Sequence, residues 1–278
     1  MSPANDLFNP VNVAGLRVAA IRTSDLIEIV ADQCRSCDAD RTGGGRRLDS
    51  GASEPSRPRS PLLISYANAW SCCLARDHPD YAHILNETAQ IVYADGQSVV
   101  WASRWLGRPL PERVNAGDFW PDLLSRLAVR GASVYLLGGV PGLAEATAHA
   151  LTRLVPDLKI AGTHHGYFAD NSSEEAAVAA AIRVAAPSVV FVGMGAPRQE
   201  RWAARHLDDL GASVLWCVGA LFEYFGGRRS RAPVWMRRFG LEWLYRLALE
   251  PARLWRRYLI GNLRFLGLVL RQRRGSIQ

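Results

Sequence analysis

The chain has 278 residues, enough for one large α/β domain or two small ones, and its 49% hydrophobic and 21% charged residues are typical of a globular protein. No run of 18 apolar residues occurs, and no basic segment precedes an apolar stretch near the start, so we expect no membrane-spanning helix, no signal peptide and cytoplasmic residence. The net charge of +7 is uneven, because residues 226–278 carry thirteen arginines and two acids while the rest is about −4.

The N-terminal part of the chain is expected to form a short strand or hairpin over residues 11–21, followed by a helix from about Thr23. Residues 38–60 are rich in Gly, Ser, Pro and Arg and have no apolar periodicity. Such a composition cannot bury enough apolar surface to fold, so we predict a disordered insert there.

After the insert, continuous apolar runs alternate with helical segments. The expected strands are residues 61–67, 91–95, 133–139, 158–163, 188–193 and 213–219. The helices expected between them include residues 119–130, 142–154, 173–185 and 197–210. Unbroken Val, Leu and Ile runs indicate strands buried on both faces, as in a parallel sheet wrapped by helices. We therefore predict an α/β fold, with a Rossmann-like, mainly parallel sheet flanked by helices over residues 8–225 and a basic helical appendage over residues 226–278.

Glycines and polar side chains gather where these expected strands end. Asp95 is followed by Gly96, and Gly138 and Gly139 close the next strand. In a parallel sheet ligands bind beyond the carboxyl ends of the strands, so this edge is the expected site. The glycines also suit ordinary turns, and Asp95 before a glycine is compatible with a simple turn.

The segment from Gly138 to Gly142 joins a strand to a helix, whose first N–H groups bind phosphate well. A nicotinamide dinucleotide would also need an acid at the end of the next strand, to bind the ribose. That strand ends in Thr163, His164 and His165, which argues against a dehydrogenase. A nucleotide diphosphate held mainly by backbone amides remains open.

Three patterns that can indicate a metal are weak here. The DxD pattern at residues 38–40 lies in the expected insert, which offers no rigid placement. The CxxC pair at Cys34 and Cys37 lacks a second pair at zinc spacing, so we expect free thiols. His164 and His165 have no Cys or His partner at a matching spacing, and we expect them to hydrogen-bond locally.

The stretch "VGMGAPRQE" ends one strand and begins the next helix. Gly193 and Gly195 let the backbone approach a ligand closely. Pro197 is expected at the first helical position, where its missing N–H costs nothing. Gln199 then falls at the third helical position, where it either closes a capping box or contacts a nucleotide.

Several long blocks of the chain resemble the WecG/TagA/CpsF family of bacterial glycosyltransferases. They include "ADGQSVVWASRWLGRPLPERVNAGDFWPDLL", "VYLLGGVPG", "FVGMGAPRQERW", "VGALFEYFGG" and "RAPVWMRRFGLEWLYRLALEPARLWRRYLIGN". The resemblance runs from about Val11 to Phe265, interrupted by the insert.

The resemblance implies an inverting transfer of a sugar, usually of the N-acetylmannosamine type, from a UDP-sugar. The acceptor is usually a saccharide on a polyprenyl diphosphate, an intermediate of surface polysaccharide synthesis. The resemblance implies no metal ion and no other cofactor, and leaves a homo-oligomer open. A different class, a non-catalytic nucleotide- or RNA-binding module with a basic tail, is the alternative.

The resemblance also implies roles for particular residues. Asp95 corresponds to the family's proposed base, which removes the proton of the acceptor hydroxyl. Asn68 matches the family's Thr-x-Asn motif, with Tyr66 at the threonine position, which leaves the role of a hydroxyl there open. Arg113 corresponds to an arginine that stabilises the departing diphosphate, or it forms a surface ion pair. Glu223 stands where the family commonly has Asp, so a ribose or base contact there is open. The other expected substrate contacts are Gly138, Gly139, Gly195, Gln199 and Arg231.

The basic tail combines its arginines with aromatic and aliphatic residues such as Trp235, Phe239 and Trp255. This combination on amphipathic helices suits an anionic membrane surface. Arginines with aromatics also bind RNA, but no RNA-binding motif accompanies them. The family resemblance places this appendage at the membrane, so we expect a peripheral protein on the inner face of the cytoplasmic membrane, with no nucleic-acid partner. A basic helical pair packed on the core is the alternative.

Overall fold

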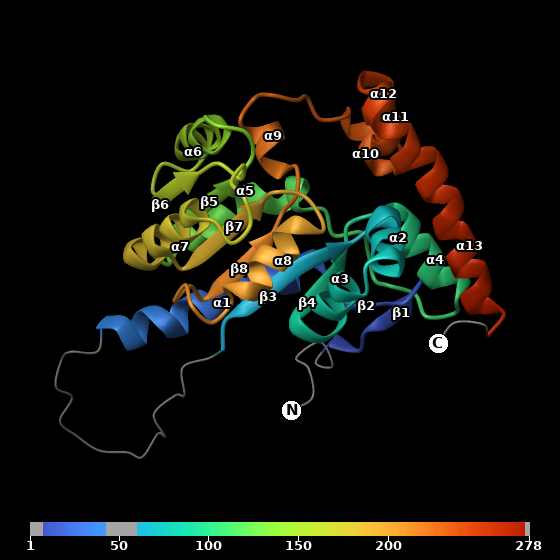
Figure 1. Cartoon of the computed structure of the whole chain (residues 1–278), viewed down its shortest axis with the longest axis horizontal. Helices are drawn as coiled ribbons and strands as arrows, with labels where there is room; N and C mark the ends of the chain where they lie inside the picture. The colour runs from blue at the N-terminus through green and yellow to red at the C-terminus, as the bar shows by residue number, and fades with distance from the viewer. Residues whose placement is uncertain (1–7, 43–59, 276–278) are drawn as a thin grey trace, which may run out of the picture.

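A computed structural model describes residues 8–42 and 60–275 of the chain. Six parallel strands form its central sheet, in the order β4-β3-β8-β7-β5-β6 (Figure 1). They are β3 (Leu62–Ala67), β4 (Ile91–Ala94), β5 (Ser133–Gly138), β6 (Lys159–His164), β7 (Val189–Gly193) and β8 (Val214–Cys217). Each coincides with one of the six continuous apolar runs, so the predicted α/β fold is confirmed.

The N-terminal segment forms the expected hairpin and helix. Strands β1 (Val11–Val13) and β2 (Leu16–Val18) pair antiparallel, and α1 (Thr23–Thr42) follows. The prediction that the insert begins at residue 38 was wrong, because residues 38–42 continue α1. No glycine or proline interrupts that stretch, and the helix ends directly before three consecutive glycines, which are poor helix formers. The rest of the predicted insert, residues 43–59, lies outside the described residues.

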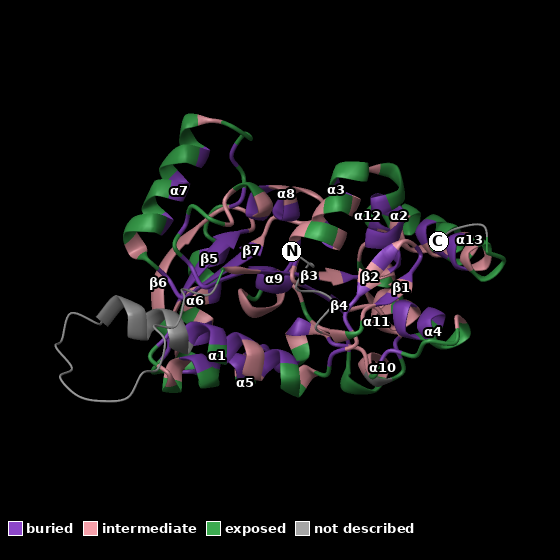
Figure 2. Cartoon of the chain, turned by 90° about the horizontal axis from the view of Figure 1, so that it is seen from below, coloured by how far each residue is buried: buried purple, intermediate pink, exposed green. Residues whose placement is uncertain are grey.

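Helices join the strands. They are α2 (Ala69–Asp77), α3 (Pro79–His83), the π-helical turn η2 (Ile84–Thr88), α4 (Gln97–Trp105), α5 (Ala116–Val129), α6 (Leu143–Leu154), α7 (Ser173–Ala185), α8 (Arg198–Arg205) and α9 (Leu221–Phe225). Those named in the sequence analysis are present, although α8 is shorter than predicted. Helices α1 and α5 cover one face of the sheet and α3, α7 and α8 cover the other (Figure 2).

Alternate residues of each strand supply the two halves of the core. In β3, Leu63 points into the layer shared with α2, α3, α7 and α8, whereas Ile64 points into the layer shared with α1, α5 and α6. Both side chains are fully buried. Because both faces are covered, most of the strands are apolar at nearly every position, which is why they appear in the sequence as apolar runs, whereas the edge strand β6 is only partly buried and begins at Lys159.

The C-terminal appendage is helical, as expected. It contains α10 (Val234–Arg238), α11 (Glu242–Leu249), α12 (Pro251–Trp255), the π-helical turn η3 (Arg256–Ile260) and α13 (Gly261–Arg273). Helix α13 runs beside α2 and α4 (Figure 1), with an ion pair of 2.7 Å between Arg264 and Asp77. Arg273 lies over the ring of Trp105 in α4. The division into two domains at residues 225 and 226 stays a prediction. No helix within the described residues has both the length and the apolarity needed to cross a membrane.

Candidate functional site

The carboxyl ends of β3 and β4 place two polar residues side by side. The parallel register aligns Ala67 with Ala94, so Asn68 and Asp95 follow at neighbouring positions. The backbone N–H of Asp95 donates to the carbonyl of Ala67 at 3.0 Å. A Cβ on Gly96 would lie 3.0 Å from the Cβ of Asn68, so the glycine after Asp95 permits this close approach.

A cavity of about 390 Å³ lies over this edge of the sheet, and we call it the strand-end cavity. Backbone from the ends of four strands forms much of its floor: Gly139, Gly166, Gly193, Gly195 and Gly219. The side chain of Asp95 also lines it. A cavity therefore lies where the sequence predicted a site, beyond the carboxyl ends of the strands.

A second cavity, of about 540 Å³, lies between α2, α4 and the appendage. Aromatic side chains dominate its walls: Trp70, Trp101, Trp105, Trp243, Tyr258 and Phe265. We call it the aromatic cavity. The strand-end cavity is mainly polar and the aromatic cavity mainly apolar, so the two suit ligand parts of opposite character.

Five residues line both cavities and so mark their junction: Asn68, Trp70, Asp95, Arg246 and Arg257. The side chain of Asn68 has a structural role, because its Oδ1 accepts a hydrogen bond from the N–H of Ser71 at the start of α2. Its Nδ2 makes no hydrogen bond to any described residue. Asp95 is thus the one carboxylate among these five residues. The side-chain amide of Asn68 beside it can donate a hydrogen bond to a ligand.

The environment of Asp95 suits a group that accepts a proton. Its Oδ1 accepts a hydrogen bond of 2.8 Å from the Nδ2 of Asn115, while its Oδ2 has no donor among the described residues. Burial raises the pKa of Asp95 to about 6, against the opposing effect of Arg113. A carboxylate with this pKa is mostly ionised at neutral pH and remains a stronger base than an exposed one.

Gln199 occupies a different position from the expected one. Pro197 is the N-cap of α8 rather than its first residue, so Gln199 is the second residue, and its side chain is fully buried. Its Oε1 accepts from the N–H groups of both Gly195 and Gly219, at 3.1 and 3.0 Å. Gln199 does not line either cavity. Its observed role is to join the loops that follow β7 and β8.

Gly138 and Gly139 likewise make contacts within the protein. A Cβ on Gly138 would lie 2.5 Å from the carbonyl of Gly193, so only glycine allows these two loops to touch. The N–H of Gly139 donates to the oxygen of Gly193, and the N–H of Gly166 donates to the oxygen of Gly139. Together with Gly195 and Gly219, these amides are already engaged, so they are not free to bind a phosphate.

Arginines supply the positive charge of the strand-end cavity instead. Five of them line it: Arg198, Arg229, Arg246, Arg253 and Arg257. Among the described residues, neither Arg246 nor Arg257 has a carboxylate partner, and the buried Nε of Arg257 has no hydrogen-bond acceptor. Sequence reasoning did not single out these two. For Arg257 the "RLWRRY" block was the available signal, but the sequence does not say which of its three arginines faces inward. For Arg246 the signal was a single arginine in "GLEWLYRL".

Arg231 and Arg113 meet at Asp118 rather than in the strand-end cavity. Arg231 donates to Asp118 at 2.8 Å and to the backbone oxygen of Gly117 at 2.7 Å. Arg113 pairs with Asp118 at 2.8 Å and with Glu242 at 3.5 Å, and it lines the aromatic cavity. Arg231 lines neither cavity. It ties the start of the appendage to the loop that carries Asn115.

Glu223 lines the strand-end cavity, but its carboxylate is already paired. Arg229 forms an ion pair with it and also contacts Glu250 of the appendage, at 3.0 Å. A ligand that reaches Glu223 must therefore share it with Arg229.

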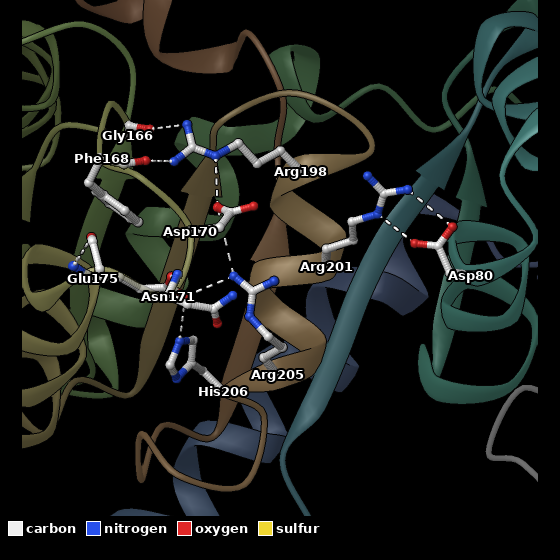
Figure 3. Close-up of polar contacts among 11 residues, drawn as sticks. Asp80, Gly166, Phe168, Asp170, Asn171, Glu175, Arg198, Arg201, Arg205 and His206 are labelled. Atoms are coloured by element: carbon white, nitrogen blue, oxygen red, sulfur yellow. Dashed lines mark hydrogen bonds and ion pairs between the residues drawn. The ribbon is translucent and has the colours of Figure 1, made fainter.

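The loop between β6 and α7 forms one wall of the strand-end cavity, and α8 holds it in place (Figure 3). Arg198 donates to the backbone oxygens of Gly166, at 2.6 Å, and Phe168. Buried Glu175 in α7 accepts from Arg205 at 2.8 Å and lies 3.0 Å from the ring of His206. These contacts fix the position of Gly166 relative to β7.

His164 and His165 hydrogen-bond locally, as expected, since Nδ1 of His164 lies 2.8 Å from the oxygen of His165. The structure adds Glu174, whose carboxylate lies 3.7 Å from Nε2 of His165, and the three form the one potential metal-ligand group among the described residues. Because Nδ1 of His165 accepts from the N–H of Tyr167, the neutral ring carries its hydrogen on Nε2. That nitrogen then has no lone pair for a metal. The four described cysteines form no disulfide.

Comparison with known proteins agrees with this arrangement. The model of the "Glycosyl transferase WecG/TagA/CpsF family" matches residues 49–278. A protein of Staphylococcus aureus (strain NCTC 8325 / PS 47), named N-acetylglucosaminyldiphosphoundecaprenol N-acetyl-beta-D-mannosaminyltransferase, is 34% identical over 209 residues, or 75% of this chain and 78% of that protein. The protein of the same name from strain MRSA252 is similar to the same extent. The chain belongs to the WecG/TagA/CpsF family of glycosyl transferases.

Proposed function

We propose that the chain transfers a sugar from a UDP-sugar to a saccharide carried on a polyprenyl diphosphate, with inversion at the anomeric carbon and without a metal ion. The observation that carries the proposal is the position of Asp95 at the junction of a polar and an apolar cavity. The names of the Staphylococcus aureus relatives, which specify an undecaprenol-diphosphate-linked acceptor, support the acceptor class.

The nucleotide sugar occupies the strand-end cavity in this proposal. Its diphosphate requires positive charge, and Arg246 and Arg257 supply cations that have no carboxylate partner among the described residues. Because the glycine amides are already hydrogen-bonded, either to neighbouring glycine carbonyls or to Gln199, these arginines take the place of the backbone amides that often bind phosphate in α/β folds. Side-chain cations aimed at the leaving group stabilise the charge that develops on it.

The acceptor enters from the aromatic cavity, so that its lipid lies among tryptophans and its sugar hydroxyl reaches Asp95. Asp95 takes the proton from that hydroxyl as the oxygen attacks the anomeric carbon. The bond between this carbon and the diphosphate breaks on the opposite side, and its electron pair leaves with UDP. One displacement of this kind inverts the anomeric configuration.

The outer wall of the aromatic cavity suits contact with a membrane. Trp101 of α4 is 54% exposed and Leu263 of α13 is 72% exposed. Trp235 and Phe239, near α10, are also exposed. Exposed aromatic and aliphatic residues among arginines are typical of peripheral attachment to anionic lipid, and attachment would place the aromatic cavity next to its substrate.

The experiment that tests the proposal measures release of UDP from a panel of UDP-sugars, with a short-chain polyprenyl-diphosphate saccharide as acceptor. We expect release that depends on both substrates and continues in EDTA. Nuclear magnetic resonance of the product gives the anomeric configuration, which we expect to be opposite to that of the donor. Activity that EDTA abolishes and manganese or magnesium restores would overturn the metal-independent mechanism.

The same experiment separates the proposal from the alternative of a non-catalytic nucleotide- or RNA-binding module. Binding of UDP without any acceptor-dependent release, across the donor panel, would favour that alternative. Membership of a glycosyl transferase family weighs against it.

A further inference from the structure

Tyr66 lies in the floor of the strand-end cavity, and the mechanism above gives it no role. It stands near the end of β3, where the register pairs it with Tyr93 of β4, two residues before Asp95. Its side chain is half-buried, so one surface of the phenol meets the protein and the other meets the cavity.

The phenol is held in one place by its neighbours. Its oxygen accepts a hydrogen bond from the Nε2 of Gln199 at 3.3 Å. A Cβ on Gly219 would lie 2.6 Å from the same oxygen, so the hydroxyl fits tightly against a glycine backbone. Gln199 in turn is fixed by Gly195 and by Glu200, so the hydroxyl rests on a buried network rather than on a mobile loop.

This contact leaves the hydrogen of the hydroxyl available. Because the oxygen accepts from Gln199, its own hydrogen must find another partner, and among the described residues no acceptor lies in hydrogen-bonding geometry with it. Burial, followed by the negative charge of Glu200, raises the pKa of Tyr66, so the hydroxyl keeps its hydrogen throughout the working range of pH. A fixed phenol that is always protonated is a directional donor to whatever fills the cavity.

We infer that Tyr66 is a specificity-determining residue that donates a hydrogen bond to the transferred sugar of the donor and limits the size of that sugar. The inference rests on the proposed function. The sugar must lie close to Asp95, where its anomeric carbon reacts, and Tyr66 is on the adjacent strand at that end of the cavity. The unpaired arginines, by contrast, come from the appendage and face the diphosphate.

Two variants separate the hydroxyl from the ring. Tyr66→Phe keeps the ring and removes the donor, so it should weaken binding of the preferred UDP-sugar about five- to tenfold, the effect of one neutral hydrogen bond. Binding of UDP, which has no sugar at that position, should not change. Tyr66→Thr also removes the ring, so it should shift the ratio of kcat/KM toward donors with a larger sugar substituent by about tenfold or more.

Tyr81→Phe is the matched control. Tyr81 is a fully buried tyrosine of α3 that lines neither cavity, and its hydroxyl has no hydrogen-bond partner in the part of the chain that the structure describes. The same chemical change there should leave both the affinities and the donor ranking as in the wild type. It shows that loss of a phenolic hydroxyl does not by itself alter the site.

The measurements are calorimetric affinities for UDP and for UDP-sugars, and kcat/KM over the donor panel. A selective loss for UDP-sugars in Tyr66→Phe, with a changed ranking in Tyr66→Thr, supports the inference. Equal weakening of UDP and UDP-sugar in Tyr66→Phe, or an unchanged ranking in Tyr66→Thr, overturns it. A wild-type chain that binds UDP-sugars but transfers none would refute the proposed function, while the affinity comparison would still decide the role of Tyr66.

Discussion

The side-chain amide of Asn115 donates a hydrogen bond of 2.8 Å to the Oδ1 of Asp95. The oxygen of the same amide accepts from Arg231, at 3.2 Å, at the beginning of the appendage. Asn115 therefore connects the carboxylate of Asp95 to the beginning of the appendage. This chain of contacts gives Arg231 an indirect role that differs from the phosphate contact predicted from the sequence.

Replacing Asp95 tests its role as the base. Asp95→Asn keeps the shape and removes the proton acceptor, so turnover should fall about 100-fold or more, as is typical when a general base is removed. Affinity for UDP should stay close to that of the wild type, because the arginines are intact. Steady-state kinetics and calorimetry measure the two quantities, and near-normal turnover would remove Asp95 from the mechanism.

The pH dependence of the rate should report the same group. Because burial raises the pKa of Asp95 to about 6, kcat/KM should fall about tenfold per pH unit below that value, where the base is protonated. Asn115 stabilises the ionised form, so Asn115→Ala should raise this pKa and move the acid limb to higher pH. An acid limb that stays in place in Asn115→Ala would show that the limb belongs to another group.

The raised pKa of Asp95 also leads to a prediction about the stability of the fold. The folded pKa of Asp95 exceeds the unfolded value of about 3.9, so between about pH 4 and pH 6 the folded protein binds more protons at this site than the unfolded chain. The contribution of Asp95 to the free energy of unfolding therefore falls as pH rises through that window. Asp95→Asn should not show this loss, so its melting temperature at pH 7 should equal or exceed that of the wild type. A markedly lower melting temperature would contradict this account.

Two adjacent arginines provide a matched pair for the diphosphate contact. Arg257 lines both cavities, whereas Arg256 is exposed and lies against the ring of Trp255. Arg257→Gln should reduce turnover about tenfold or more, because it removes a cation from the leaving group. Arg256→Gln removes the same charge from the chain and should have little effect on transfer to a water-soluble acceptor. Equal losses in the two variants would indicate a general effect of charge.

The appendage should both attach the protein to membranes and complete the site. Each arginine near an anionic surface contributes about 1 kcal/mol, so about half of the thirteen suffices for reversible attachment. Truncation after Gly227 should abolish sedimentation with anionic vesicles, and salt should weaken it in the full chain. Truncation also removes Arg246 and Arg257, so activity on a water-soluble acceptor should be lost. A truncated chain that remains active would leave the appendage as an anchor only.

The segment over residues 43–59 should be dispensable. Its composition offers few apolar side chains to bury. Replacing it with a short Gly/Ser bridge should leave the melting temperature and the rate of transfer almost unchanged, while α1 and residue 60 keep their contacts. A large loss of either would show that the segment contributes to the fold or the site.

The sheet could be predicted from the sequence because burial on both faces makes most of its strands nearly unbroken apolar runs. The location of the candidate site could be predicted from the same pattern, since parallel strands bring Asn68 and Asp95 to one edge. The direction in which an individual side chain points could not be predicted from this pattern. Gln199 points into the protein because two loops, after β7 and β8, present N–H groups to it, and their distance from each other is a tertiary property.

The roles of the arginines were harder to predict for a similar reason. Arg231 lies in the block "RAPVWMRR" that resembles the family, which led to the prediction of a substrate contact. In the structure its guanidinium forms an ion pair with Asp118 instead. Arg246 and Arg257 reach the junction of the cavities only because α11, η3 and α13 fold back over α2 and α4. Composition revealed an excess of positive charge in the appendage, but only the fold selects which cations face inward.

The bridge that Gln199 forms between Gly195 and Gly219 has a consequence for motion. The Oε1 of Gln199 accepts a hydrogen bond from each of the two loops. A loop that shifts therefore either breaks its own hydrogen bond to Gln199 or pulls Gln199 away from the other loop. The floor of the strand-end cavity is therefore stiff, and any adjustment of this cavity to a ligand has to come from its roof. That roof is the appendage, the same part of the molecule that we expect to rest on lipid, so substrate exchange and membrane contact would be mechanically linked.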